Sequence, residues 1–351
     1  MEQFFSQLLN TTRFISGSIM SSKNYPKVSF IIPLLNEGGT IKQALDSIES
    51  LDYPLEQIEI ILAKGPSKDD TNKIIEDYAK NFKNIVIIDN PTGNTAIGRN
   101  LCIKHSSGDM LMNYSGHVTA EKNLLKILAL RLAESPKEIV SVGCSNVSPQ
   151  KQNLVGETAS VVFSSFLGGK NLFVQNAEFD EERYSDHVSF ACYRKKPVVD
   201  VGSFDPDFWC GQDAELDLRL LKKGYKILYT PKTKVYHFKR STIKSLFKQM
   251  YRYGIARVNM IKKHPDTLKI FHLFGAGFIL GIIAILILTL LSIVPVWFPF
   301  FLAVAYLLAS FASSLRVSKK PVVVAVSPLF YFLVHAGYGI GFLRGSIYGK
   351  L

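Results

Sequence analysis

Hydrophobic and polar positions divide the sequence into two parts. Before residue 271, short apolar runs rich in β-branched residues alternate with stretches in which apolar residues recur at helical spacing. The runs at 27–35, 58–62 and 84–88 predict strands that are buried on both faces of a sheet, and the stretches at 40–51 and 71–82 predict helices between them. Strands and helices in this alternation are typical of a doubly wound α/β domain.

The second part has the composition of a membrane domain. From residue 271 onward there is no Asp or Glu, so all 29 acids lie before it. The apolar runs at 271–291, 294–315 and 321–343 are each long enough to cross the roughly 30 Å hydrocarbon core as a helix, although Pro328 and His335 interrupt the third. One such run could be a buried core helix, but three in succession favour three transmembrane helices.

The charge distribution predicts how these helices are oriented. Basic residues flank the predicted spans: Lys262, Lys263 and Lys269 before the first, and Arg316, Lys319 and Lys320 between the second and the third. The positive-inside rule then predicts a multi-pass protein of the cell membrane with its first domain in the cytoplasm. The net charge of +12 would also suit nucleic acid, but the dense basic stretch just before the spans favours anionic lipid, so we expect no nucleic acid as a partner.

Three features of the residues before 271 exclude particular kinds of segment, site and enzyme. Residues 1–24 lack the basic start and unbroken apolar core of a signal peptide and predict a short amphipathic helix. The four cysteines include no CxxC pair, so we expect neither a disulfide nor a zinc site. The first strand–helix turn, NEGGT, has no GxGxxG, which argues against a dinucleotide-binding oxidoreductase.

Residues 110–117, MLMNYSGH, predict a strand that ends in a turn, and this turn is the first candidate for a ligand-binding site. Ligands bind at the carboxyl ends of strands in open α/β sheets, and an acid there often holds a metal ion on a phosphate. This turn has Ser115, Gly116 and His117 but no acid. One interpretation is that it is only a turn with a glycine where the backbone needs one.

Nine short motifs in order resemble the family 2 glycosyltransferases of GT-A fold, over residues 28–265. The motifs are VSFIIPLLNE, LDYP, AKGPSKDDT, GRN, GD with the strand into SGH, VGSFDP, GQDAELDLRLLKKGYKI, PKTKVYHFKRST and QMYRYG. The resemblance is strongest to the membrane-bound enzymes that build bacterial exopolysaccharides of the succinoglycan type. It implies a nucleotide-sugar donor, an acceptor hydroxyl that attacks the anomeric carbon from the opposite side, and inversion of configuration.

The resemblance also implies site residues. Asp213, in GQDAEL, occupies the position of the general base, although an acid at a helix start could instead be a cap. Six residues fall at positions that contact the donor: Pro33, Asn36, Glu37, Lys64, Arg99 and Ser115.

The resemblance also implies residues near the acceptor and candidate metal ligands. Gln249, Arg252 and Tyr253 resemble the QxxRW element near the acceptor and the diphosphate, with Tyr in place of Trp. The surrounding residues also predict a basic interfacial helix, and both interpretations can hold at once. By resemblance, His117 and His237 are candidate metal ligands, each with a structural role as the alternative.

Two acids of the family pattern are missing. Lys64 stands where an Asp contacts the nucleobase, and Ser115 stands where an Asp binds the divalent ion. Because Ser and His suit Mg²⁺ poorly, the case for Mg²⁺ or Mn²⁺ is weakened and we assign no cofactor. The chain could be active without a tightly held metal, active with an altered donor, or a catalytically silent relative that binds a partner enzyme or a lipid-linked glycan. Asp213 together with the QxxR element favours activity.

These inferences combine into one architecture. We expect an amphipathic segment at 1–24, an α/β GT-A domain at 25–240, a basic interfacial helix at 241–266 and three transmembrane helices within 267–351. The expected partners are a nucleotide-sugar donor, a membrane-borne acceptor such as a polyprenyl-linked one, and anionic lipid. The long polar stretch 168–187 is a candidate for closing over the acceptor.

Overall fold

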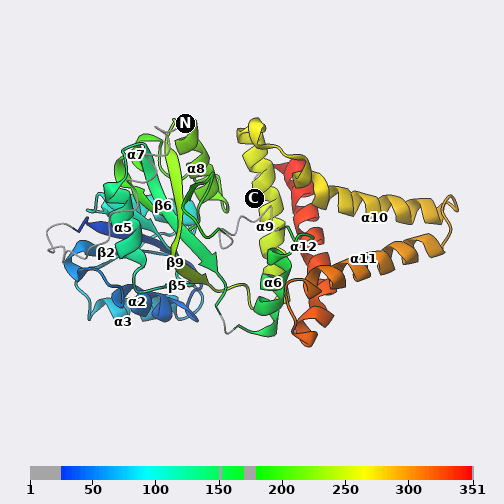
Figure 1. Ribbon diagram of the computed structural model, residues 1–351, viewed down its shortest axis with the longest axis horizontal. Coiled ribbons are helices and arrows are strands. Elements are labelled where there is room, and N and C mark those ends of the chain that lie inside the picture. The colour runs from blue at the N-terminus through cyan, green and yellow to red at the C-terminus, as the bar shows by residue number, and fades with distance from the viewer. Residues whose placement is uncertain (1–24, 150–151, 170–178, 350–351) are drawn as a thin grey trace, which may run out of the picture.

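The α/β domain and the apolar helices form two distinct halves of the molecule (Figure 1). The computed structural model describes residues 25–149, 152–169 and 179–349. The expected amphipathic segment 1–24 lies outside the described residues, and so do residues 170–178 of the polar stretch 168–187.

Parallel strands form the first half of the sheet, as the apolar runs predict. They are β1 (Val28–Leu34), β2 (Ile58–Lys64), β3 (Ile85–Asp89) and β4 (Met110–Asn113). The helices between them are α2 (Ile41–Glu49), α3 (Thr71–Ala79) and α4 (Thr95–His105). Phe30 and Ile32 of β1 pack in one apolar cluster with α2, whereas Ile31 packs in a second cluster with α4. The strand is therefore buried on both faces, which explains its nearly continuous apolar sequence.

The second half of the sheet is mixed. Its strands are β5 (Val118–Ala120), β6 (Ile139–Val147), β7 (Arg183–Tyr184), β8 (Cys192–Arg194) and β9 (Lys226–His237). The strand order is β3-β2-β1-β4-β8-β6-β9-β5, with β7 beside β9, and β8 runs antiparallel to both of its neighbours. Because β8 has three residues, it is too short to show a period in the sequence. This change of strand direction was therefore not predicted.

The remaining helices of this domain are short. They are α5 (Leu124–Glu134), α6 (Leu154–Ser164), α7 (Lys195–Asp200) and α8 (Gln212–Lys222). Turns of 3₁₀ helix occur at Leu55–Gln57, Pro265–Thr267 and Ile270–Leu273.

The C-terminal part consists of four long helices. They are α9 (Ile243–Lys263), α10 (Phe274–Leu290), α11 (Trp297–Leu315) and α12 (Pro321–Tyr348). Three segments are long and apolar enough to cross a membrane: Ile270–Leu290, Trp297–Leu315 and Pro321–Tyr348. In Figure 1, α9 and α12 lie side by side next to the α/β domain, and α10 and α11 extend away from them as a hairpin.

Glycines allow α9 and α12 to touch through their backbones. A Cβ atom built on Gly341 of α12 would lie 2.0 Å from the carbonyl oxygen of Tyr251 in α9. One built on Gly254 of α9 would lie 2.2 Å from the carbonyl oxygen of Tyr338. Such close approach of two helices at small residues is a common way of packing apolar helices. Any larger residue at these positions would push the helices apart.

We therefore predict that Gly341→Ala lowers the stability of the protein in detergent by about 1–3 kcal/mol, the usual cost of overpacking. Gly281→Ala on α10 is the matched control, because a Cβ there meets nothing within 4 Å. That change should leave stability unchanged or raise it, since Ala favours helix over Gly. Thermal unfolding of both variants is the measurement, and equal melting temperatures would contradict the backbone contact.

Candidate active site

The loops after β1 and β2 interlock at the carboxyl edge of the sheet. The Asn36 side-chain oxygen accepts a hydrogen bond from the Lys68 backbone N–H at 2.8 Å. The Glu37 backbone N–H donates to Thr71 Oγ1 at 2.7 Å. Asn36 has a positive φ of 57°, a conformation that Asn adopts more readily than most residues. The structure thus brings Asn36 and Glu37 together just beyond Pro33 on β1, where a ligand of an α/β sheet binds.

Lys64, the cation in place of a family Asp, has local counter-charges. Its Nζ atom lies 3.1 Å from a carboxylate oxygen of Glu76 and 3.4 Å from one of Asp89. The hydrogen bonds to Glu76 and Asp89 raise the pKa of Lys64. A diphosphate near Lys64 would therefore compete with two carboxylates for the same ammonium group.

Asp213 lies in the first turn of α8, which follows Gly211 in the left-handed region at φ 71°. Its Oδ1 accepts a hydrogen bond from the Ala214 backbone N–H at 3.0 Å, and its Oδ2 lies 3.9 Å from His187 Nε2. The N-cap position belongs to Gly211, so Asp213 is not the cap of the helix. About a quarter of its side chain is exposed, 26%, so a substrate can reach the carboxylate.

The half-buried His187 and the buried Asp217 form a pair next to Asp213. His187 Nδ1 lies 2.6 Å from Asp217 Oδ2, and the Tyr193 hydroxyl donates to Asp217 Oδ1 at 2.8 Å. The Asp217 side chain has no exposed surface. Burial opposes a charge on His187, but the hydrogen bond to Asp217 and the charge of Asp213 raise its pKa to about 9. At neutral pH, His187 is therefore a cation next to Asp213.

Arg99 of α4 provides a second cation. Its side chain is buried and stacks over the Phe204 ring, with the guanidinium carbon 5.0 Å from the ring centroid. Among the described residues, its Nε and Nη1 atoms have no hydrogen-bond acceptor. Burial alone would raise the pKa of Asp213, but the charges of His187 and Arg99 outweigh it and lower that pKa. The carboxylate of Asp213 is thus held in its ionised form.

His187, Asp217 and Tyr193 did not emerge as site residues from the sequence. Asp217 follows Asp213 by one helical turn, a spacing that could have marked the two acids as neighbours on one face of α8. His187 comes from a loop and Tyr193 from β8, and no local pattern links either residue to α8.

The QMYRYG motif lies on α9 and contacts the segment before α8. Cys210 Sγ donates a hydrogen bond to the Arg252 carbonyl oxygen at 3.3 Å, and Gln249 Nε2 donates to the Tyr253 hydroxyl at 3.2 Å. Burial raises the pKa of Tyr253 to about 12, with further contributions from the charges around it, including Asp213. The structure therefore brings the predicted base and the QxxR element close together.

The SGH turn is held by a carboxylate from another loop. His117 Nδ1 lies 2.9 Å from Glu37 Oε1, and the rings of His117 and His237 have centroids 5.0 Å apart. Burial, with the charges of Lys239 and His117, keeps the pKa of His237 well below its usual value, so this imidazole is neutral. Ser115, on the same turn, is half-buried.

These side chains do not fit the oxygen-rich ligand set that Mg²⁺ requires. Within the described ranges, no three or more His, Cys, Asp or Glu side chains are grouped so as to hold a metal ion. The candidate ligands His117 and His237 lie together, but the nearest carboxylate, Glu37, already engages His117.

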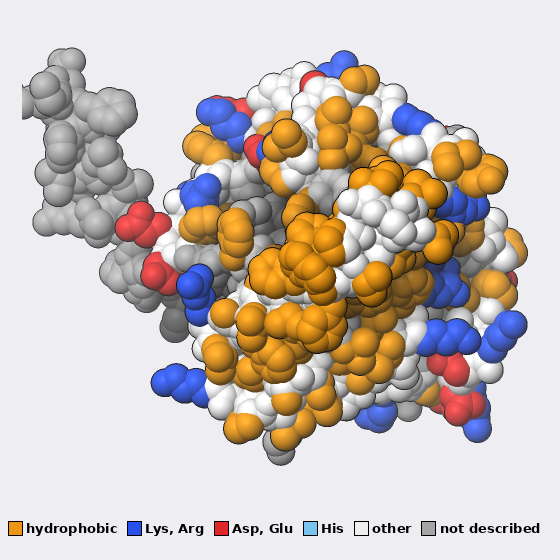
Figure 2. Space-filling view, turned by 90° about the vertical axis from the view of Figure 1, so that its right-hand side faces the viewer, with side chains coloured by type: hydrophobic (Ala, Val, Ile, Leu, Met, Phe, Trp, Pro, Cys, Tyr) orange, Lys and Arg blue, Asp and Glu red, His pale blue; other side chains and the backbone are white. Residues whose placement is uncertain are grey.

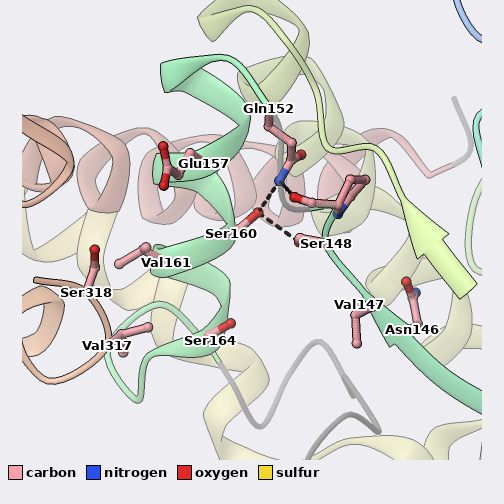
Figure 3. Close-up of a pocket in the computed structure, with 11 residues that line it drawn as sticks. Asn146, Val147, Ser148, Gln152, Glu157, Ser160, Val161, Ser164, Val317 and Ser318 are labelled. Atoms are coloured by element: carbon pink, nitrogen blue, oxygen red, sulfur yellow. Dashed lines mark hydrogen bonds between the residues drawn. The ribbon is translucent and has the colours of Figure 1, made fainter. Parts of the chain in front are cut away.

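A separate polar cavity of about 390 Å³ lies between the end of β6, α6 and the segment that joins α11 to α12 (Figure 3). Gln152 Nε2 donates to Ser160 Oγ at 3.2 Å, and Ser148 Oγ lies 2.8 Å from the same atom. Glu157, on the same helix as Ser160, also lines the cavity. None of the predicted site residues lines this cavity.

Comparisons with known proteins identify the family of the chain. Residues 29–202 match the family model "Glycosyl transferase family 2", and residues 129–315 match "Glycosyl transferase family group 2". The chain is 30% identical over 333 residues to a dolichyl N-acetyl-α-D-glucosaminyl phosphate 3-β-D-2,3-diacetamido-2,3-dideoxy-β-D-glucuronosyltransferase of Methanococcus voltae, covering 92% of this chain and 98% of the relative. It is 27% identical over 259 residues to the succinoglycan biosynthesis protein ExoA of Rhizobium meliloti, covering 70% of this chain and 74% of the relative.

A solved structure shares the fold. The mannosyltransferase PcManGT of Pyrobaculum calidifontis, in complex with GDP-Man and Mn²⁺, aligns with a TM-score of 0.56 at 14% identity, covering 99% of this chain and 94% of that one. The GT-A fold expected from the sequence is confirmed by this likeness. The chain therefore belongs to glycosyl transferase family 2 and is a glycosyltransferase.

Proposed function

We propose that the protein transfers a sugar, with inversion, from a nucleotide-sugar to an acceptor carried on a membrane lipid at the cytoplasmic face. The observation that carries this proposal is the position of Asp213. It is an ionised, partly exposed carboxylate at the carboxyl edge of the sheet, and its preceding segment contacts α9. The site thus lies beside α9, the basic helix that packs on α12.

Transfer with inversion takes place in one step, in which the acceptor oxygen displaces the diphosphate from the sugar. The acceptor oxygen attacks the anomeric carbon, its proton passes to Asp213, and the bond from that carbon to the diphosphate breaks with its electron pair on the phosphate oxygen. The lowered pKa of Asp213 makes it a weak base, so proton transfer is favourable only after the new C–O bond has begun to form and the hydroxyl has become acidic. Arg99, whose buried Nε and Nη1 atoms have no acceptor among the described residues, and Arg252 of the QxxR element would supply positive charge for the leaving diphosphate.

The lipid acceptor and the cytoplasmic face are each supported by one observation. The Methanococcus voltae relative, which matches nearly the whole chain, is named for a dolichyl phosphate substrate. The basic residues before α10 and after α11 also lie on the domain side of the hairpin, which supports a cytoplasmic site by the positive-inside rule. The proposed acceptor class is a sugar linked through phosphate to a polyprenyl-type lipid.

The first prediction tests the base. Asp213→Asn should lower the transfer rate by about 10²–10⁴-fold, because proton removal is lost, and should leave donor binding nearly unchanged. Asp200→Asn on the exposed surface of α7 is the control and should keep full activity. Transfer by the Asp213→Asn variant at the unmodified rate would remove Asp213 from the mechanism.

The second prediction concerns pH. The pKa of His187, about 9, lies above its ordinary value of 6.5, so its charge is present at neutral pH and is lost as pH rises through about 9. Activity should therefore fall as pH rises through about 9. The stability that the proton adds is complete below pH 6.5, declines as pH rises above that value and is lost once pH has passed about 9. His187→Gln should lower kcat and remove this alkaline decline, whereas His105→Gln, at the exposed end of α4, should do neither. An unchanged pH profile in the His187→Gln variant would rule out its role.

The third prediction concerns the metal. Because the SGH turn has no acid, donor binding measured by calorimetry should change little when EDTA is added. Lys64→Ala should weaken binding, since Glu76 and Asp89 would then repel an anionic donor, whereas Lys68→Ala in the next loop should not. Lys64→Asp combined with Ser115→Asp should create dependence on divalent ions. Loss of most donor affinity in EDTA by the unmodified protein would refute this account.

A further inference from the structure

The three apolar helices differ in what surrounds them. In the most apolar stretch of α10, and likewise of α11, 11% of the residues are buried in the protein, whereas in α12 the share is 67%. The described parts of α10 and α11 thus bury few residues apart from those that meet α12, as expected of helices that contact lipid. α12 is mainly a protein-packing helix.

Both ends of α12 are attached to elements on the side of the catalytic domain. At its start, the Lys320 ammonium pairs with Glu157 of α6. In its middle, the Tyr331 hydroxyl lies 2.8 Å from Ser165 Oγ, just after α6. At its end, Lys262 Nζ of α9 donates to the Gly345 carbonyl oxygen at 2.9 Å. The helix therefore stays against the catalytic side along its whole length.

The second half of α12 follows α9 turn by turn. Gly337 packs on Phe247 and Met250, Gly341 packs on Tyr251, and Gly345 packs on Ile255 and Val258. The residue numbers rise together on both helices, so the two run parallel, as Figure 1 also shows. Any path that α12 takes through a bilayer would have to be shared by α9.

α9 cannot share such a path at reasonable cost. It carries six basic residues: Lys244, Lys248, Arg252, Arg257, Lys262 and Lys263. Each charged side chain at the centre of a membrane helix costs about 2.5–3.5 kcal/mol even on the most lenient scale. α6, which packs against the first half of α12, is 11 residues long and contains Glu157, so it cannot span either.

Five exposed apolar side chains of α12 form one stripe. They are Val322, Leu329, Phe332, Ile340 and Ile347. Their spacing places them on one face of the helix. Figure 2 views the molecule from the side on which α10 and α11 project, and shows hydrophobic side chains over the centre of this face with Lys and Arg around the edge. An apolar surface with a basic rim suits the boundary between acyl chains and anionic head groups.

We propose that α10 and α11 alone cross the bilayer, and that α12 lies along the membrane surface with its apolar stripe in the lipid. The membrane part is then a two-helix hairpin whose tip, residues 291–296, reaches the far side. The C-terminus returns to the side of the catalytic domain, opposite to the three-span arrangement that the sequence predicts. The partner of the α12 stripe is the lipid bilayer itself.

Single cysteines test this arrangement in the full-length protein. We would introduce Tyr348→Cys at the end of α12, Ile293→Cys at the hairpin tip and Glu56→Cys on the catalytic domain. All three positions are exposed. The background is Cys210→Ser, since the other three cysteines are buried. Sealed membrane vesicles with the catalytic domain outward are treated with a membrane-impermeant maleimide.

The proposal predicts that Tyr348→Cys reacts as readily as Glu56→Cys, while Ile293→Cys reacts only after detergent is added. Protection of Tyr348→Cys until detergent is added would establish three spans and overturn the proposal. Labelling of Ile293→Cys without detergent would also overturn it, because the hairpin would not cross. A green fluorescent protein fused after Leu351 provides a second measurement: it should fluoresce when the C-terminus is cytoplasmic and stay dark when it is exported. Neither readout depends on the proposed reaction.

Discussion

A buried carboxylate, Glu215 of α8, connects the helix that bears Asp213 to the end of α9. Its side chain has no exposed surface, and it contacts Arg219 at 2.8 Å, Lys263 at 2.7 Å and His264 at 3.1 Å. Burial would raise the pKa of Glu215, but these partners outweigh it and keep the group ionised. Removing one partner of a buried ion pair typically costs about 3–5 kcal/mol, because the remaining charge is left in an apolar environment. The turn of α8 that bears Asp213 is thereby fixed to the end of α9, and α9 is fixed to α12 by glycine contacts.

Each acid of the candidate site lies next to a cation. Asp213 lies near two cations, His187 and Arg99, and the second acid, Asp217, is paired with His187. The two cations keep Asp213 ionised by lowering its pKa, and the lower pKa makes its carboxylate a weaker base. The same principle applies to Lys64, whose charge is matched by Glu76 and Asp89. The charge at position 64 is therefore less available to a diphosphate than the sequence alone would indicate.

The strands and helices that depend on the spacing of apolar residues were predictable from the sequence. The parallel strands β1 to β3, the helices between them and the three apolar helices follow from residue spacing and are confirmed. Features that depend on tertiary contact were not predictable. His187 reaches Asp217 from a loop, β8 is too short to show a period, and the partners of Lys64 come from a helix and a neighbouring strand. α12 has the composition of a membrane span, and its packing against α9 distinguishes it from α10 and α11.

The stereochemistry of transfer tests the central claim most directly. A single displacement assisted by the Asp213 carboxylate must invert the anomeric carbon, because the acceptor attacks from the side opposite to the leaving diphosphate. The measurement is the proton NMR coupling at the anomeric position of the product, compared with that of the donor. The account predicts a β-linked product from an α-linked nucleotide-sugar. An α-linked product would contradict it, since retention requires either a covalent intermediate or attack from the same face.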